Sequence, residues 1–482
     1  MDLRPILAVV GLFLTVFGLG MLAPAVVDYA THDFDWQVFA VAAAVTVFIG
    51  VGLVFAYRPK RNTRLTLRQT FVLTSLSWVT IATFGALPFA FSNLPMSFTD
   101  AFFESMSGLT TTGSTVLSGL DTTPVGILLW RAMLQWAGGI GIVVTAVAVL
   151  PYLRVGGMQL FRTESSDRSE KVVPKLSQMT GEILAVYVTL TGLCAGLLWL
   201  AGMTPFEATA HAMTTVSTGG YSTADASVGY FNSALVEAVI IVFMLAGGVT
   251  FTLYLQSLHD NPSVLWRNSQ VRWFLGLVAI AAGVIAGWQF LINDVALATA
   301  IRSSLFNVVS IVTTTGFASA DYSQWGTFPV VLLHFLTFVG SCTGSTSGGL
   351  KIFRFQVLSA LTVALIRRTL HPHGMFQPTY EGRVISEAVG LSVMGFFFLF
   401  GTSFAVLALL LSLCGLDLVT SVSGAATAIA NVGPGLGDVI GPAGNFASLP
   451  DPAKLLLAAG MLLGRLELLT VLILFSPDFW RA

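Results

Sequence analysis

Apolar segments alternate with short polar connections along nearly the whole chain. Runs of about 20 apolar residues, the length that crosses roughly 30 Å of hydrocarbon, recur many times. The clearest of these runs are 6–27, 39–57, 71–91, 125–151, 183–203 and 384–414. The pattern predicts an all-α, multi-pass membrane protein, and we expect ten spans together with four shorter pore helices.

Four semi-polar segments interrupt this pattern and are too short to cross a bilayer. They occupy 101–109, 206–214, 302–312 and 418–430. Each precedes a stretch that contains Gly and, in the first three cases, Thr: "LTTTGSTVL" at 109–117, "TVSTGGYST" at 215–223, "IVTTTGFAS" at 311–319 and "IANVGPGLG" at 429–437. Aligning these stretches on one glycine selects Gly113, Gly219, Gly316 and Gly433. The interval of about a hundred residues predicts four tandem units of helix, half-helix, loop and helix.

The units divide the chain into five expected parts. Two extra N-terminal transmembrane helices occupy 1–69, and the four pore repeats follow at 70–155, 176–260, 270–370 and 383–482. Backbone that leaves helical structure at membrane depth is tolerated only where protein buries it or where it lines an aqueous cavity. We therefore expect the four loops to surround one central pore.

The residue types in the loops favour a monovalent cation. Glycine permits backbone conformations that turn successive carbonyl oxygens toward an axis, and the half-helices direct their negative dipole ends at the loops. Rings of carbonyls form potassium filters, whereas a divalent site would more often present carboxylates. The predicted ion-binding residues are Thr111, Thr112, Gly113, Ser217, Thr218, Gly219, Thr314, Thr315, Gly316, Asn431, Val432 and Gly433.

Composition and charge agree with a membrane protein. The 482 residues are 55% hydrophobic and only 10% charged, which is too apolar for a soluble protein. Nineteen of the 23 Lys and Arg residues, Lys351 and Arg354 among them, lie in alternate connections. The positive-inside rule places these connections and both termini in the cytoplasm.

The opposite connections carry acidic residues and would attract cations, although solvated loops also favour Asp. These residues are Asp100, Glu104, Asp121, Glu207, Asp225, Asp294, Asp321, Asp417 and Asp438. Cys194, Cys342 and Cys414 lack metal-like spacing, so the sequence suggests neither a disulfide framework nor a zinc site.

The four loops together resemble those of the Trk, Ktr and HKT superfamily of potassium transporters. The resemblance runs from about Thr70 to the C-terminus, and the two preceding helices look like the extra pair of the bacterial Trk-type (TrkH-like) membrane subunits. It implies potassium uptake through a degenerate filter whose common element is glycine. In the HKT branch a serine at the Gly113 position is associated with sodium transport, so glycine here implies a preference for potassium.

The resemblance also implies partners and a location. Family members are homodimers in the bacterial inner membrane, they carry no covalently bound cofactor, and they bind a cytosolic TrkA-like nucleotide-binding regulatory subunit. The basic segments 58–68, 151–175 and 259–272 are plausible docking surfaces for that subunit.

A glycine-rich run interrupts the second helix of the third repeat. Its residues are poor helix formers, and a plain cytoplasmic loop here would leave 330–339 too short to span. In the family the corresponding segment is an intramembrane gating loop. The resemblance thus assigns gating to Gly340, Gly344, Ser345, Thr346, Gly348 and Gly349.

Arg465 lies inside an apolar helix of the fourth repeat. A lone charge there is costly and usually faces a bundle interior or an aqueous cavity. In the family such an arginine lies under the filter near the gating loop, where it would hinder cations. A structural ion pair with a buried acid of another helix is the alternative, and Glu467, two positions on, points elsewhere.

Two other functions, an intramembrane protease and a coupled symporter, share single features with this sequence. "GLGD" at 435–438 has the form of an intramembrane aspartyl protease motif, but that chemistry needs two carboxylates and the partner Tyr-Asp dipeptide is absent. A sodium- or proton-coupled alternating-access symporter would favour inverted repeats, whereas these units share one orientation. The sequence therefore predicts a transporter and no enzyme, with His211 and His334 as packed residues.

Overall fold

The computed structural model describes residues 1–57, 65–148, 172–259 and 261–481. Helices dominate this part of the chain, and the strands within it are β1 (Thr379–Tyr380) and β2 (Arg383–Val384), which form a small antiparallel hairpin. Seven of the described helices are long and apolar enough to cross a membrane, and two bent helix pairs raise the number to nine. The predicted all-helical membrane fold is confirmed.

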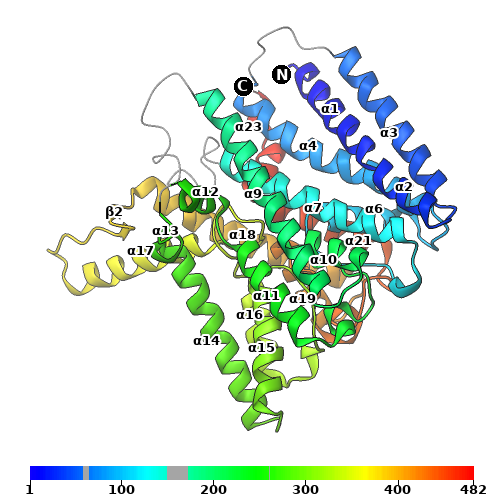
Figure 1. The fold of residues 1–482 in the computed structure, drawn as a ribbon. Coiled ribbons are helices and arrows are strands. Elements are labelled where there is room, and N and C mark those ends of the chain that lie inside the picture. The colour runs from blue at the N-terminus through cyan, green and yellow to red at the C-terminus, as the bar shows by residue number, and fades with distance from the viewer. Residues whose placement is uncertain (58–64, 149–171, 260, 482) are drawn as a thin grey trace.

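The N-terminal helices pack together on one side of the molecule (Figure 1). They are α1 (Arg4–Gly20), α2 (Leu22–Ala30), α3 (Trp36–Ala56), α4 (Leu67–Gly85) and α5 (Leu87–Phe91). A Cβ atom at Gly11 would lie 2.6 Å from the carbonyl oxygen of Gly50, so the absence of side chains lets α1 and α3 approach closely.

Four short helices enter the interior and end there. They are α6 (Phe98–Leu109), α10 (Pro205–Val216), α15 (Leu297–Val312) and α19 (Leu418–Ala430). Ser97 and Thr204 begin α6 and α10 with capping boxes, and Asp417 accepts the Thr420 backbone N–H at the start of α19. These side chains satisfy backbone donors that a helix start leaves unpaired.

Longer helices surround the short ones and continue the units. The long helices are α7 (Val125–Ala148), α9 (Val172–Leu200), α14 (Ser269–Leu291) and α18 (Glu387–Leu413). The bent pairs are α11 (Ala234–Gly248) with α12 (Phe251–His259), at 90°, and α21 (Asp451–Arg465) with α22 (Leu469–Leu472) and η5 (Ile473–Phe475), at 108°. Short elements connect them: η1 (Leu120–Thr122), η3 (Ser227–Phe231), α13 (Val264–Arg267), η4 (Tyr322–Gln324), α20 (Gly437–Ile440) and α23 (Pro477–Arg481).

The remaining expected span, the second helix of the third repeat, is broken. Helix α16 (Thr327–Thr337) has only 11 residues, and α17 (Ile352–Leu370) begins after an irregular segment. Figure 1 shows α17 and the β1–β2 hairpin projecting from one side of the molecule.

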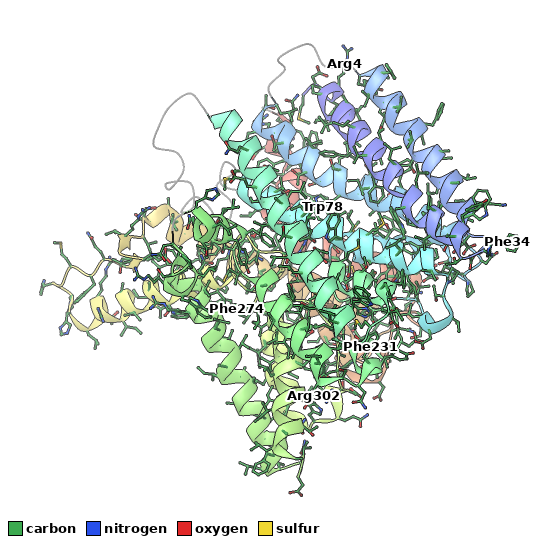
Figure 2. The ribbon with its side chains drawn as sticks, viewed as in Figure 1. Arg4, Phe34, Trp78, Phe231, Phe274 and Arg302 are labelled. Carbon is green, nitrogen blue, oxygen red and sulfur yellow. The ribbon has the colours of Figure 1, made fainter. Side chains whose placement is uncertain are left out.

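The side chains fill the space among the helices, as Figure 2 shows. Phe274 of α14 is fully buried, whereas Phe34, between α2 and α3, is 78% exposed. Of the expected docking segments, 58–64 and 151–171 lie outside the described residues.

Candidate functional site

The four loops that follow the short helices share one backbone path. One residue at the end of each short helix adopts a left-handed conformation, with φ of 52° at Thr111, 51° at Thr218, 57° at Thr314 and 55° at Asn431. It follows the C-cap in the first three units and is the C-cap itself in the fourth. Two residues later comes a glycine with positive φ: Gly113 at 87°, Gly220 at 79°, Gly316 at 84° and Gly433 at 108°. The residue between them donates its N–H to the last helical turns, as from Thr112 to Ser107 and from Gly219 to Thr214.

This geometry corrects the alignment of the second loop by one residue. Gly220, and not Gly219, has the conformation of the other three glycines, and Ser217 is the helix cap. Thr218, Gly219 and Gly220 therefore correspond to Thr111, Thr112 and Gly113. The signal was present in the sequence, because sixteen residues separate the helix N-cap from the glycine in three of the loops: Ser97 from Gly113, Thr204 from Gly220 and Asp417 from Gly433.

The four glycines touch the neighbouring loops in cyclic order. A Cβ atom at Gly113 would overlap the carbonyl oxygen of Gly219. The same relation holds from Gly220 to Thr315, from Gly316 to Val432, and from Gly433 to Thr112, where the separation would be 2.8 Å. Since each contact involves the carbonyl just before the next glycine, the four loops close into one ring, which we call the glycine ring.

Hydrogen bonds join the first and fourth members of the glycine ring. Asn431 donates its side-chain amide to the Thr112 hydroxyl and to the Met461 carbonyl, each at 2.9 Å, and the Ser114 hydroxyl donates to the Gly433 carbonyl at 2.8 Å. The structure thus brings all the loop residues named from the sequence together and buries their side chains. The buried polar members are Thr111, Thr112, Ser217, Thr218, Thr314, Thr315 and Asn431.

The glycine-rich segment between α16 and α17, residues 338–351, lies against the inner ends of these loops. The Thr346 hydroxyl donates to the Val216 carbonyl at 3.1 Å, and the Gly348 N–H donates to the Thr314 hydroxyl at 2.7 Å. A Cβ atom at Gly348 would overlap the Ala430 carbonyl. The segment therefore contacts three of the four units directly below the glycine ring. We call it the inner segment.

Arg465 reaches the inner segment from the end of α21. It is 2% exposed and donates to the Thr346 carbonyl at 2.8 Å and to the Gly138 carbonyl of α7 at 3.4 Å. Among the described residues no carboxylate pairs with Arg465. Beside this contact, the inner segment and the residues Gly464, Arg465 and Glu467 line a cavity of about 20 Å³, which is large enough for one water.

Three charged residues of this region, Lys351, Arg354 and Glu467, lie in surroundings that the sequence does not predict. Lys351 and Arg354, expected in a solvated connection, are only 7% and 0% exposed. The Lys351 ammonium donates to the Ser347 hydroxyl at 2.9 Å, and the Arg354 guanidinium pairs with Glu467. Sequence spacing does not predict these contacts. Glu467 is 113 residues from Arg354, and Ser347 lies in the irregular segment just before Lys351.

The expected acidic outer face also needs a correction. Glu104 is fully buried and forms an ion pair with Arg131 at 2.8 Å, so it is not a surface charge. Asp100 pairs with Lys454 at 2.5 Å. Burial alone would raise the pKa of Asp100, but the hydrogen bonds from Lys454 and Ser97 lower it, so the carboxylate stays ionised.

Known proteins resemble this chain in sequence and fold. The sequence matches the TrkH family, described as cation transport protein, over residues 36–481. It is 45% identical to the Trk system potassium uptake protein TrkI of Halomonas elongata over 478 residues, which cover 99% of this chain and 97% of that protein. It is 40% identical to the Trk system potassium uptake protein TrkH of Escherichia coli K12, with 100% of both chains covered. The crystal structure of the potassium transporter TrkH from Vibrio parahaemolyticus matches with a TM-score of 0.92 and 36% identity, again over 100% of both chains.

Proposed function

This chain belongs to the TrkH family of cation transport proteins, and from that premise we propose that it takes up potassium ions through the glycine ring. It is a multi-pass membrane transporter and not an enzyme. The observation that carries the proposal is the cyclic contact of the four glycines with the carbonyls of the next loop. Four loops with one backbone path around a common axis supply the repeated carbonyl oxygens that replace the hydration shell of potassium.

The electrostatics of the site support a monovalent ion. Helices α6, α10, α15 and α19 end at the ring, so their negative dipole ends favour a cation there. Glu104 is close to the first loop, but its charge is balanced by Arg131. With its charge already compensated, this carboxylate is a poor ligand for a divalent ion.

We further propose that the inner segment and Arg465 obstruct the path below the ring. The contacts of Thr346 with Val216 and of Gly348 with Thr314 support this, because they hold the inner segment against the loops. Arg465, whose guanidinium stays charged at physiological pH, adds a positive charge at the same level. Cations would pass when this segment moves aside.

The assembly is proposed on the family premise. The protein would form a homodimer in the bacterial inner membrane, with both termini in the cytoplasm, and would bind a TrkA-like nucleotide-binding regulatory subunit. The two termini lie at the same end of the molecule, in agreement with this orientation (Figure 1).

Ion flux into liposomes tests the proposed function. The purified chain is expected to carry rubidium, a potassium substitute, in preference to sodium, and to do so without a sodium or proton gradient. Equal rubidium and sodium flux would contradict a potassium filter. Rubidium flux that requires a second ion gradient would instead support a coupled symporter. Complementation of a bacterium that lacks potassium uptake provides the matching test in cells.

A further inference from the structure

One position in each short helix faces the outer arm of its loop. With Gly113, Gly220, Gly316 and Gly433 as reference, the position nine residues earlier carries a different residue in each unit. These residues are Glu104, His211, Asn307 and Gly424. In the first three units the side chain at this position forms hydrogen bonds with the residues that follow the glycine.

Glu104 holds the first loop and, through Arg131, the second. Its carboxylate accepts the Val116 N–H at 2.9 Å and the Thr115 hydroxyl at 3.0 Å. Arg131 of α7 donates to Glu104 at 2.8 Å and to the Ser222 carbonyl of the second loop at 2.9 Å. The pair therefore links the outer arms of two neighbouring loops.

The second loop provides an aromatic face to this ion pair. The Arg131 guanidinium lies 4.0 Å from the centre of the Tyr221 ring. The Tyr221 hydroxyl donates to the Glu104 carbonyl at 2.9 Å. The charges are thus enclosed by groups of the first and second units, and moving one loop disturbs the other.

His211 takes the corresponding place in the second unit. Its Nδ1 lies 2.8 Å from the Glu207 carbonyl, which can only accept, so Nδ1 donates and Nε2 accepts from the Ser222 hydroxyl at 3.1 Å. The ring also stacks on Phe317 of the third loop, with centroids 5.9 Å apart. His211 therefore links the second loop to the third.

The support becomes weaker in the third and fourth units. Asn307 donates to the Ser319 hydroxyl at 3.1 Å within its own loop. At Gly424 there is no side chain, and the nearest neighbour of a Cβ atom there would be the methyl of Ile440, at 3.3 Å. The series runs from an ion pair, through an imidazole and an amide, to an apolar contact.

We propose that Glu104 with Arg131, His211 and Asn307 are positioning residues that set ion selectivity by fixing the outer arms of the first three loops. This inference rests on the proposed function, since it concerns the selectivity of the glycine ring. The contribution decreases in the order of the units, and in the fourth unit a different side chain of the short helix, Ser423, accepts the Leu436 N–H at 3.0 Å. None of these side chains needs to contact the ion, because each one acts through the backbone of its loop.

The rubidium-to-sodium flux ratio in liposomes tests this inference. The double variant E104Q/R131M removes both charges together, so no buried charge is left unpaired. It is expected to lower the ratio by roughly fivefold, because it removes the hydrogen bonds that Arg131 donates to Glu104 and to the Ser222 carbonyl. The variant H211L is expected to lower it by less, and N307L by about twofold at most.

Matched controls lie on the same helices. Thr209 on α10 is exposed and Ser303 on α15 is half-buried, and the hydroxyl of each bonds to its own helix, at the carbonyls of Pro205 and Thr299. The variants T209A and S303A are expected to keep the parent ratio. A ratio that falls equally in these controls would overturn the inference.

A gentler pair of variants covers the case in which the double variant does not fold. S222A removes the hydroxyl that donates to His211 Nε2 and accepts the Ala224 N–H, whereas S222T retains it. S222A should lower the flux ratio and S222T should restore it. Melting temperatures of the purified proteins distinguish a positioning role from a merely structural one. A merely structural role would lower the melting temperature while the flux ratio stays constant.

The parent protein distinguishes this inference from the proposed function. A parent without preference for rubidium would overturn both. A selective parent whose ratio is unchanged by E104Q/R131M, H211L and S222A would overturn the positioning role alone.

Discussion

The chain leaves helical structure at two levels, in the outer glycine ring and in the inner segment, and the two are held differently. Each outer loop continues one of the short helices, and a side chain of that helix holds it. Glu104, His211 and Asn307 do so in the first three units, and Ser423 does so in the fourth. The inner segment is held mainly by other elements. Gln270 accepts the Thr343 N–H at 2.9 Å, and Thr250 donates to the Thr343 carbonyl at 2.6 Å.

The difference separates a fixed structure from one that can move. An outer loop cannot shift without breaking contacts to the helix that it continues. Under the proposed function, the inner segment would leave once its contacts with α10, α11, α12, α14, α21 and the third and fourth loops are exchanged. Its own ends would remain paired, because the Gly340 N–H donates to the Leu350 carbonyl at 2.8 Å. We infer that selectivity depends on the first kind of support and gating on the second.

The largest effect is expected from shortening the inner segment. Deleting residues 343–347 removes Thr346 and the groups that contact α10 and α11. Flux should rise by roughly thirtyfold, a change of about 2 kcal/mol in the barrier, and should depend less on the regulatory subunit. The measurement is rubidium flux per folded molecule in liposomes. A folded deletion variant with parental flux would exclude the inner segment as the barrier.

Removal of the Arg465 charge should have the next largest effect. In a poorly solvated passage the guanidinium repels a monovalent cation more strongly than in bulk water. R465A should therefore raise potassium flux by roughly tenfold, about 1.4 kcal/mol, whereas R465K, which keeps the charge, should change it less. If Arg465 serves only to hold Thr346 and Gly138, R465A would reduce the yield of folded protein and leave the flux of each molecule unchanged.

Substitution of the ring glycines should alter selectivity and leave gating unchanged. A side chain at Gly220 would overlap the Thr315 backbone at a positive φ, whereas at Gly219 its nearest neighbours would be side-chain atoms of the buried Gln135. G220S and G113S should each lower the rubidium-to-sodium ratio by roughly fivefold, about 1 kcal/mol, and G219S should lower it less. Equal ratios in G219S and G220S would argue against the revised alignment.

The smallest effect is expected at the start of α19, away from both levels. Hydrogen bonds from the Thr420 side chain and backbone lower the pKa of Asp417. D417A should cost about 0.5 to 1 kcal/mol of stability, while D417N, which keeps the cap, should cost less. Because the folded-state pKa is depressed, the contribution of the charge is full above about pH 4 and is lost as pH falls through that pKa. Thermal unfolding at several pH values measures it, and a loss of selectivity in D417A would be unexpected.

The sequence predicted those parts of the fold that depend on local signals. Short semi-polar segments marked α6, α10, α15 and α19, because their length and composition distinguish them from spans. The second loop was misaligned because Gly219 and Gly220 are adjacent and only one has the required φ. Residue type alone does not distinguish two neighbouring glycines.

The charged pairs of the interior could not be predicted in the same way. Arg354 and Glu467 are separated by 113 residues, and Glu104 and Arg131 by 27. Their pairing depends on how separate helices pack, which no local pattern encodes. Charge counting therefore placed Lys351, Arg354 and Glu104 in solvent, although the structure buries all three.

The closed contact of Gly113, Gly220, Gly316 and Gly433 within one polypeptide has an evolutionary consequence. In a channel built from four identical subunits, a single codon change alters every quadrant at once. Under the proposed function, a codon change here alters one quadrant of the glycine ring, so the other three would preserve conduction while that quadrant acquires a new preference. Selection can therefore adjust discrimination between alkali ions in small increments, and the four unequal supports at Glu104, His211, Asn307 and Gly424 are the divergence that such a history would leave.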